Sequence, residues 1–392
     1  MRIAWISYDF LEYSSLHVNA LSKEHEVLAV LPKQECIDEE HQLDADVKCF
    51  LFDKPRLRQP IKQNRSIRSI LRALAEFRPE VVHFQQSHLW FNFSLKKLQK
   101  HFPLVITIHD PRHHSGDAVS KKTPQWVVDH GFRQADHAIV HGRKLVPTVC
   151  DLFGFQQDQV HVIPHVAMGN MSNGGQIDSS LTDPNTILFF GRIWDYKGLN
   201  YLIQAEPYIS RECPDARFVI AGQGDDFQKY RDMMENPKRF VVHNQWITDE
   251  ERAEFFSQAG VVVLPYTDAT QSGVVPVAYN YQKPVVATRV GALSDCVADG
   301  ETGLLVPPKD PQALAAAIVR LLKNPTLAQK MGKAGRDWVE DECSPEAVAR
   351  QHVEAYKKAV IFRANQLGQG AATAFPTATQ LDQNTKLEAR NE

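Results

Sequence analysis

The fold is decided by the stretch Ile187-Leu188-Phe189-Phe190-Gly191-Arg192-Ile193-Trp194-Asp195-Tyr196-Lys197-Gly198. An apolar run ends at Gly191-Arg192, and Lys197-Gly198 stands ahead of an amphipathic segment. This order predicts a buried strand, a loop and a helix. Because ligands bind at the carboxyl ends of strands in open α/β sheets, the loop would place Arg192 and Lys197 at a ligand. The two cations suit a doubly charged anion such as a diphosphate, although two solvated surface cations would give the same pattern.

The first part of the chain alternates strand and helix patterns. We expect strands at 2–7, 26–31, 80–84, 104–108, 138–141 and 160–164, and helices at 16–22, 67–77, 95–101, 126–134 and 146–153. Residues 8–15 and 33–65 are expected to be irregular. Such alternation predicts a parallel sheet with helices on both faces.

A change of composition at 167–185 predicts a linker, because this stretch is rich in small and polar residues and has almost no apolar period. The alternation then resumes, with strands expected at 187–190, 217–221, 240–243, 261–264, 284–287 and 303–306 and helices at 199–209, 227–234, 249–259, 274–281, 293–297, 311–323 and 328–341. We therefore predict an α/β protein of two Rossmann-like parallel-sheet domains, residues 1–166 and 186–344, that face each other across a cleft. Residues 365–392 are predicted to be a disordered tail.

Length and composition are those of a soluble protein with two domains. The chain has 392 residues, 43% hydrophobic and 23% charged, with a net charge of -3. General electrostatic binding to nucleic acid is therefore not indicated, although Arg56 to Arg72 is a local basic stretch. The six cysteines form no Cys-x-x-Cys pair, so we expect a reduced, cytoplasmic protein. No apolar run approaches the roughly 20 residues of a membrane span, and Met1 to Ser7 is predicted to be a strand and not a signal peptide.

A second polar cluster, Tyr266 to Gly273, lies between a predicted strand and a predicted helix. Small residues at a helix N-terminus offer free N–H groups and the positive end of the helix dipole. Gln271, Ser272 and Gly273 could seat a phosphate opposite the Arg192 loop, or they could form a plain N-cap. The motif Ala221-Gly222-Gln223-Gly224 is either a loop on the nucleotide side or a tight turn.

Histidines mark the strand ends of the first domain. The run His109-Asp110-Pro111-Arg112-His113-His114 follows one strand, and His83 and His165 stand at the ends of others. A histidine there can hydrogen-bond a hydroxyl, orient a reacting group or move a proton, and we favour such a role for the run over a structural one. A metal site is disfavoured because the run lacks helical i,i+4 spacing and a Cys partner.

Taken together, the motifs resemble the retaining glycosyltransferases of the GT-B class, closest to the group 1 (family four) nucleotide-sugar transferases. The resemblance runs from about residue 186 to 325. It is carried, in the family's order and spacing, by Phe190-Gly191-Arg192 with Lys197-Gly198, Ala221-Gly222-x-Gly224, Trp246-Ile247-Thr248-Asp249-Glu250-Glu251, Leu264-Pro265-Tyr266, Gly273, Lys283-Pro284-Val285-Val286-Ala287, Gly291 and Asp299-Gly300-x-Thr302-Gly303-Leu304-Leu305-Val306. The first domain matches loosely, through His83, His109 and Ile163-Pro164-His165.

The resemblance implies a division of roles. Arg192 and Lys197 would hold the donor's diphosphate and stabilise the leaving nucleoside diphosphate without a metal or other cofactor. His109 would contact the donor sugar near the anomeric carbon. The donor-binding set would comprise Gly191, Arg192, Lys197, Gly222, Ile247 near the nucleobase, Gln271, Ser272 and Gly273. A helix at 345–363 would cross back and complete the first domain.

The chain departs from the family pattern at two positions. The family usually carries two glutamates eight residues apart around the start of the helix expected at 274–281. In this sequence the two positions are occupied by Ala269 and Val277. Asp268 or Gln271 is a candidate to replace the first, and we assign Asp268 to the catalytic set. Nothing obvious replaces the second, which normally binds the ribose. Tyr8 to Ser15 also lacks the glycines that the family carries after its first strand.

The function implied by the resemblance is the transfer of a sugar, with retention of configuration, from a nucleotide-sugar to a glycan or lipid-linked acceptor. Such a hexosyltransferase would serve surface or exopolysaccharide biosynthesis in the cytoplasm, and a peripheral contact with the inner face of the membrane stays open. Two other interpretations also stay open: a non-catalytic relative that binds a glycan or a nucleotide, and a GT-B nucleotide-sugar epimerase. The sequence does not specify the donor base, the sugar, the acceptor or the linkage.

Overall fold

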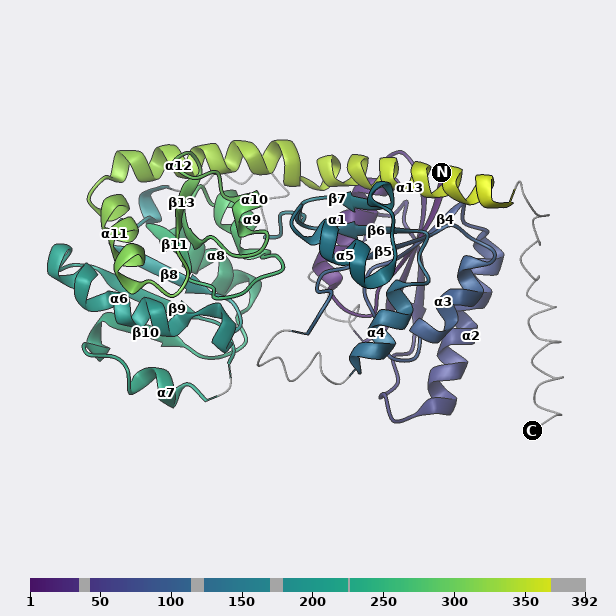
Figure 1. Ribbon diagram of the computed structural model, residues 1–392, viewed down its shortest axis with the longest axis horizontal. Helices are drawn as coiled ribbons and strands as arrows, with labels where there is room; N and C mark the ends of the chain where they lie inside the picture. Colours follow the sequence, from purple (N-terminus) through teal and green to yellow (C-terminus); the bar gives the residue numbers. More distant parts are fainter. Residues whose placement is uncertain (35–42, 114–122, 170–178, 225, 368–392) are drawn as a thin grey trace.

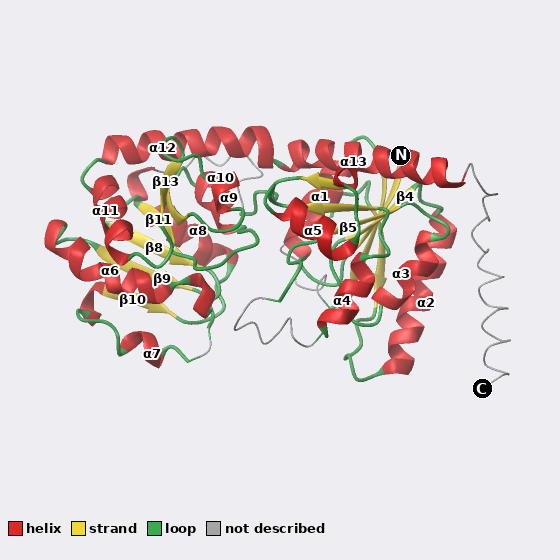
Figure 2. Cartoon of the chain, viewed as in Figure 1, coloured by secondary structure: helices red, strands yellow, loops and turns green. Residues whose placement is uncertain are grey.

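Two α/β domains lie side by side in the computed structural model, which describes residues 1–34, 43–113, 123–169, 179–224 and 226–367 (Figure 1). Each contains a purely parallel sheet with helices packed on its faces (Figure 2). The predicted fold class, two Rossmann-like domains of the GT-B type, is confirmed.

The sheet of the first domain has seven strands in the order β3-β2-β1-β4-β5-β6-β7. They are β1 (Arg2–Ile6), β2 (Glu26–Pro32), β3 (Lys48–Phe52), β4 (Val81–Phe84), β5 (Leu104–Thr107), β6 (His137–Val140) and β7 (Val160–Val162). The strand order reverses between β1 and β4, so the loops that follow these two strands flank a switch point where α/β proteins bind ligands.

Two helical layers cover this sheet. One is formed by α2 (Pro60–Phe77), α3 (Asn92–Gln99), α4 (Gln125–Phe132) and α5 (Leu145–Phe153), whose apolar side chains share a core with Ile6, Phe84 and Ile106. The other is formed by α1 (Leu11–Ser22) and α13 (Pro345–Leu367), which pack over Trp5, Ala29 and Val105. Because side chains alternate along a strand, each strand serves both cores.

The sheet of the second domain has six strands in the order β10-β9-β8-β11-β12-β13. They are β8 (Thr186–Phe190), β9 (Arg217–Ala221), β10 (Phe240–His243), β11 (Val261–Leu264), β12 (Val285–Thr288) and β13 (Gly303–Val306). The helices are α6 (Leu199–Glu212), α7 (Gln228–Arg231), α8 (Asp249–Gln258), α9 (Val274–Asn280), α10 (Leu293–Cys296), α11 (Pro311–Leu322) and α12 (Pro325–Trp338). The order reverses between β8 and β11, so the strand of the opening stretch lies at the switch point of this sheet.

The chain returns to the first domain at its end. Helix α12 lies on the second domain, a π-helical turn follows at Val339–Cys343, and α13 runs along the first domain against α1 (Figure 1). The helix ends at Leu367, beyond the predicted 363, so the predicted start of the tail at 365 is wrong because the helix continues. Residues 368–392 of the tail and 170–178 of the predicted linker lie outside the described residues.

Three elements differ from the sequence-based expectation. Strand β3 falls within the stretch expected to be irregular, because it is an edge strand that pairs only with β2 and is mostly exposed. Helix α2 begins at Pro60, and its first two turns are too polar to show an apolar period. Helix α1 begins at Leu11, inside the predicted loop 8–15, and buries polar residues such as Ser14 and Ser15 that gave no helical signal.

Candidate active site

The loop from β8 to α6 is held in place by close backbone contacts. The Gly191 amide donates to the Ala221 carbonyl (2.9 Å). Gly198 has φ +69, and a Cβ added there would lie 2.0 Å from the Pro265 carbonyl oxygen. A Cβ on Gly222 would likewise lie 2.0 Å from the Gly191 carbonyl oxygen. The glycines of both motifs are therefore required by tight packing of three loops at this edge of the sheet.

The two cations of this loop lie against aromatic rings. The Arg192 guanidinium lies 3.9 Å from the centre of the Trp194 ring. The Lys197 ammonium lies 4.0 Å from the centre of the Tyr266 ring and 5.2 Å from that of Tyr196. Neither cation forms an ion pair with a residue in the described part of the chain. Burial is the main cause that lowers the pKa of Lys197 to about 8; Tyr196 opposes the shift and the charge of Arg192 contributes to it.

The start of α9 lies beside this loop. The Thr267 amide donates to the Tyr196 carbonyl (2.8 Å), and the Tyr266 and Ser272 hydroxyls are 3.3 Å apart. The Ser272 hydroxyl also accepts from the Val274 amide (3.3 Å), although the N-cap residue of α9 is Gly273, which has no side chain to cap the helix. Among the described residues, the amides of Ser272 and Gly273 have no hydrogen-bond acceptor. The start of α9, a helix of seven residues, therefore has free amides and no side-chain N-cap in the described part of the chain.

His109 approaches the same region from the first domain. Its Nε2 accepts a hydrogen bond from the Gln85 amide (2.8 Å), which leaves the ring proton on Nδ1. Burial and the neighbouring His165 lower the pKa of His109 to about 4, against a smaller opposing effect of Asp110. The ring is therefore neutral at pH 7. A neutral imidazole can offer one N–H to an oxygen but is not a cationic acid.

Contacts between the domains bring these parts together. The Thr270 hydroxyl, in the loop before α9, donates to the Asp110 carboxylate. A Cβ on Gly273 would lie 3.3 Å from the ring of His165. Because Thr267 in the same loop donates to the Tyr196 carbonyl, the contact between Thr270 and Asp110 brings the end of β5 next to the loop that carries Arg192 and Lys197.

A second contact joins α1 to α8. The Arg252 guanidinium donates to both Glu12 carboxylate oxygens at 2.9 and 3.0 Å. Both side chains are largely buried, and Glu12 also accepts from the Gly169 amide (2.9 Å), where the chain passes between the domains. This pair fixes the orientation of the two domains close to the point where they are connected.

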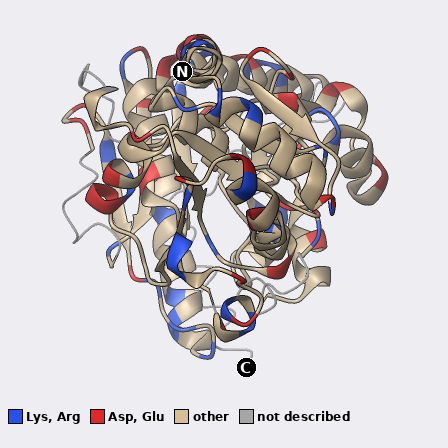
Figure 3. Ribbon diagram, turned by 90° about the vertical axis from the view of Figure 1, so that its left-hand side faces the viewer, with Lys and Arg blue, Asp and Glu red and all other residues tan. Residues whose placement is uncertain are grey.

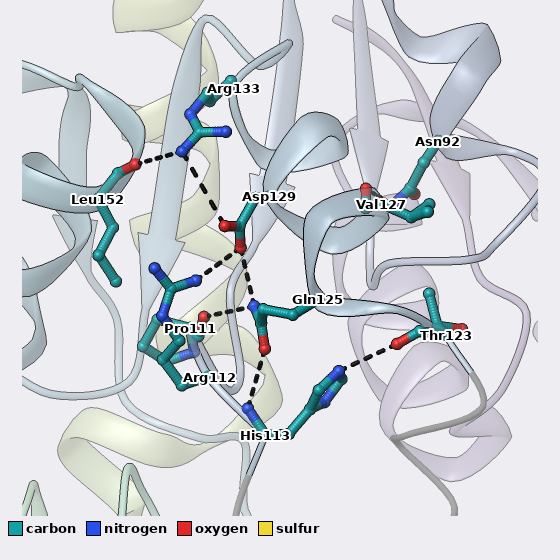
Figure 4. Close-up of polar contacts among 10 residues, drawn as sticks. All are labelled: Asn92, Pro111, Arg112, His113, Thr123, Gln125, Val127, Asp129, Arg133 and Leu152. Atoms are coloured by element: carbon teal, nitrogen blue, oxygen red, sulfur yellow. Dashed lines mark hydrogen bonds and ion pairs between the residues drawn. The ribbon is translucent and has the colours of Figure 1, made fainter.

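The residues after Asp110 turn away from the site. Figure 4 shows Arg112 bonded to Asp129 (2.7 Å), and the His113 amide bonded to Gln125 (3.2 Å). The His113 ring lies 3.0 Å from the Thr123 carbonyl oxygen. These contacts tie the loop to α4, so the favoured functional role of the run does not extend to Arg112 and His113. His114 lies outside the described residues.

Other predicted residues lie at the same sheet edge. Asp268 is exposed in the loop between β11 and α9, and Gln271 is half-buried there. The Gln271 Oε1 atom is buried and has no hydrogen-bond partner among the described residues. Ile247 is half-buried in the loop after β10 and packs against the core of the second domain. Gly222 follows the neighbouring β9.

His83, noted at a strand end, lies away from the site. It is fully buried under α13, and its two ring nitrogens lie 2.6 Å from the Tyr356 hydroxyl and 2.8 Å from that of Thr107. Its role is therefore structural, because the His83 side chain projects from the face of the sheet and not from its edge.

Sequence reasoning missed several residues of the site. Gln85 and Thr270 bind His109 and Asp110 across long separations, which no local pattern reveals. Trp194 and Tyr196 stand next to the predicted cations in sequence. Aromatic residues beside a cation in a loop are the signal that could have identified them.

The described residues contain neither a candidate metal cluster nor a helix suited to span a membrane. No group of three or more His, Cys, Asp and Glu side chains within the described ranges could hold a metal ion. No helix in that part of the chain is both long enough and apolar enough to cross a bilayer.

Comparisons with known proteins agree with this architecture. Residues 184–324 match the model of the family described as glycosyl transferases group 1, and residues 16–166 match that of glycosyltransferase family 4. The glycogen synthase of Mycobacterium tuberculosis is 28% identical over 71% of this chain and 69% of its own length. The phosphatidyl-myo-inositol mannosyltransferase of Mycobacterium leprae is 30% identical over 60% of this chain and 62% of its own.

A solved structure extends the likeness to almost the whole chain. The Anabaena protein HepE, crystallised in complex with UDP, superposes with a TM-score of 0.67 over 91% of this chain and 100% of its own. At 15% identity this likeness concerns the fold alone. The two family matches cover both domains, and the chain belongs to the group 1 glycosyltransferases. It is therefore an enzyme of the glycosyltransferase class.

Proposed function

We propose that this protein transfers a hexose from a nucleoside diphosphate sugar to a glycan or lipid-linked acceptor, with retention of the anomeric configuration. The observation that carries the proposal is the pair Arg192 and Lys197, two cations in one loop at the switch point, without an ion-pair partner among the described residues. The UDP complex of the structurally similar HepE supports a nucleotide donor.

The two cations would act mainly on the leaving group. Negative charge grows on the diphosphate oxygens as the glycosidic bond breaks, so fixed positive charges there stabilise the transition state more than the bound donor. Arg192 offers a planar fork and Lys197 a point charge. The free amides of Ser272 and Gly273 would add two donors to the same oxygens. Such a site would work without a metal.

The donor sugar would lie between the cations and His109. A neutral His109 with its proton on Nδ1 would donate to a sugar oxygen near the anomeric carbon. Asp110, which is bonded to Thr270, influences the pKa of both His109 and Lys197. Asp268 and Gln271 are the other side chains of this edge that we assign to the sugar. The base would lie near Ile247 and Gly222.

The acceptor would reach the site from the first domain. We place the enzyme in the cytoplasm, in the synthesis of a surface or extracellular polysaccharide or glycolipid, with peripheral contact to the inner face of the membrane. The name of the mannosyltransferase relative, which acts on phosphatidyl-myo-inositol, supports a lipid-linked acceptor.

The test is a donor screen followed by product analysis. UDP-, GDP- and ADP-sugars are ranked by the rise in melting temperature, and the best donor is incubated with candidate acceptors. NMR of the product should show the anomeric configuration of the donor. Arg192→Ala should abolish transfer, whereas Arg320→Ala, an exposed change on α11, should not.

Other outcomes would contradict the proposal. Nucleotide binding without any transfer or hydrolysis would favour a non-catalytic binding protein. Interconversion of two donor sugars in the absence of an acceptor would favour an epimerase. Inversion at the anomeric carbon would overturn the stereochemical part alone.

A further inference from the structure

Helices α2 and α3 carry an excess of positive charge, whereas α4 contains Asp129 and no Lys or Arg. Residues 54–109 contain eleven Lys and Arg against two acids, Glu76 and Glu80, in a chain whose net charge is -3. Elsewhere the charges mix: Figure 3 shows Lys and Arg interspersed with Asp and Glu on the side of the molecule formed by the second domain.

On α2 the cations follow the helical period on the outer face. Lys62, Arg65 and Arg68 are exposed, while Ile67 and Leu71 between them are buried in the core. These three cations have no ion-pair partner in the described part of the chain. On α3 the exposed cations are Lys96 and Lys97, which are likewise without such partners.

Large apolar side chains are exposed at the starts of the same three helices. Ile61, Phe93 and Trp126 are the second residues of α2, α3 and α4, and their exposed fractions are 77%, 49% and 64%. Helices that follow parallel strands begin at the carboxyl edge of the sheet, so the three side chains gather at one edge. We call these residues, with Lys62, Arg65, Arg68, Lys96 and Lys97, the basic–aromatic surface.

Contacts between the loops make this surface continuous. The rings of Phe93 and Trp126 are 6.0 Å apart, which joins α3 to α4. The Trp90 indole N–H donates to the Leu57 carbonyl (2.8 Å), which joins the loop before α3 to the loop before α2. The starts of α2 and α4 also lie at the same end of the first domain in Figure 1.

We propose that the basic–aromatic surface docks the enzyme on an anionic lipid bilayer. Aromatic side chains favour the interfacial zone of a membrane, and cations a few residues behind them would meet the anionic headgroups. A soluble polyanion would engage the cations but would gain nothing from three exposed apolar side chains at the edge. The combination therefore fits a bilayer better than a nucleic acid or an acidic glycan.

Docking would place the site at the membrane. The apolar side chains lie at the carboxyl edge of the first sheet, the edge that also carries His109. A lipid-anchored acceptor could then reach the donor without leaving the bilayer. This consequence rests on the proposed function, whereas membrane binding itself does not.

The test uses the full chain and vesicles, without nucleotide or acceptor. Co-sedimentation compares vesicles of equal parts phosphatidylglycerol and phosphatidylcholine with vesicles of phosphatidylcholine alone. We expect binding to the anionic vesicles in about 0.1 M NaCl, weakened at least about tenfold in about 0.5 M NaCl, because added salt screens exposed charges.

Matched variants separate the charge from the apolar contribution. Lys62→Glu/Arg65→Glu/Arg68→Glu should abolish binding, whereas Lys238→Glu/Lys330→Glu/Lys333→Glu, the same charge change at exposed positions of the second domain, should not. Phe93→Ser/Trp126→Ser should weaken binding by at least about fivefold and leave its salt dependence unchanged, since burial of aromatic area is not screened. Unchanged melting curves and nucleotide binding would show that each variant is folded.

Several results would overturn the proposal. These are equal binding to both kinds of vesicle, no binding in low salt, or equal effects of the two triple variants. Full binding by Phe93→Ser/Trp126→Ser would also overturn it, because the cations alone would then suffice, as for a soluble polyanion. A failure of the donor screen with intact vesicle binding would refute the proposed function and leave this inference standing.

Discussion

Raising the pH should weaken binding of the nucleoside diphosphate through a single group, Lys197. Burial lowers the pKa of Lys197 to about 8, and only the ammonium form pairs with a diphosphate. Below this pKa the side chain is charged and the affinity is constant. Above a pH of about 8, Lys197 loses its charge in the free protein, and the affinity for the diphosphate falls. In the complex the bound diphosphate raises the pKa of Lys197, and the fall in affinity ends when the pH reaches that higher pKa.

The size of the effect follows from the titration. The protonated fraction falls from about 0.9 at about pH 7 to about 0.1 at about pH 9. The dissociation constant should therefore rise about tenfold, which corresponds to about 1.4 kcal/mol. The terminal phosphate is already ionised throughout this range, because its second pKa is about 6.

Isothermal titration calorimetry in two buffers of different ionisation enthalpy tests this directly. The wild type should take up nearly one proton per bound nucleotide at about pH 9 and almost none at about pH 7. Lys197→Arg is the control, because a guanidinium stays charged across the range and should remove the pH dependence. Equal pH slopes in the two proteins, or a flat profile in the wild type, would refute the reasoning.

Three further predictions concern the loop, the domain contact and the histidine. Gly198→Ala places a Cβ 2.0 Å from the Pro265 carbonyl oxygen, so it should weaken nucleotide binding and lower the stability measured by urea unfolding. The control is Gly300→Ala, which is also at positive φ but whose Cβ would meet no atom of the described residues within 4 Å beyond its chain neighbours, and it should lower the stability alone. Glu12→Gln or Arg252→Met should lower the free energy of unfolding by about 1.5–3 kcal/mol, because each removes charged, largely buried hydrogen bonds, while Asp249 still pairs with Arg252 and the Gly169 amide still donates to Glu12. Single changes below about 0.5 kcal/mol would contradict the role of this pair. His109→Asn should keep nucleotide binding and lower the transfer rate about 100-fold or more. Because the pKa of His109 is lowered to about 4, the pH–rate profile of the wild type should show no loss of activity from protonation of His109 above about pH 5. A loss of activity with a midpoint at about pH 6.5 that is absent in His109→Asn would contradict the neutral state of His109.

Most of the fold could be predicted because buried parallel strands are apolar throughout. Strands β9, β10, β11 and β13 coincide with the predicted ranges. Strand β3 could not be found, because an exposed edge strand pairs on one side only and carries no continuous apolar signal. The first turns of α2 were missed because their outer face is basic and their inner face includes the polar Gln63.

In the site too, residues with a local sequence signal could be predicted, and contacts between distant residues could not. Arg192 and Lys197 could be predicted because their loop follows a recognisable buried strand. The contact between Asp110 and Thr270 joins residues 160 positions apart and depends on how the domains meet, which no local pattern encodes. The structural role of His83 could not be assigned, because sequence shows that a histidine lies in a strand but not whether its side chain points under a distant helix.

The central claim is that Arg192 and Lys197 together hold the donor's diphosphate. Calorimetry of the nucleoside diphosphate of the preferred donor, against Arg192→Ala/Lys197→Ala and against the exposed control Arg320→Ala, tests it most directly. Since charged hydrogen bonds contribute about 1.5–3 kcal/mol each, the double variant should bind at least about 100-fold more weakly, while the control binds like the wild type. Unchanged affinity in a folded double variant would contradict the account.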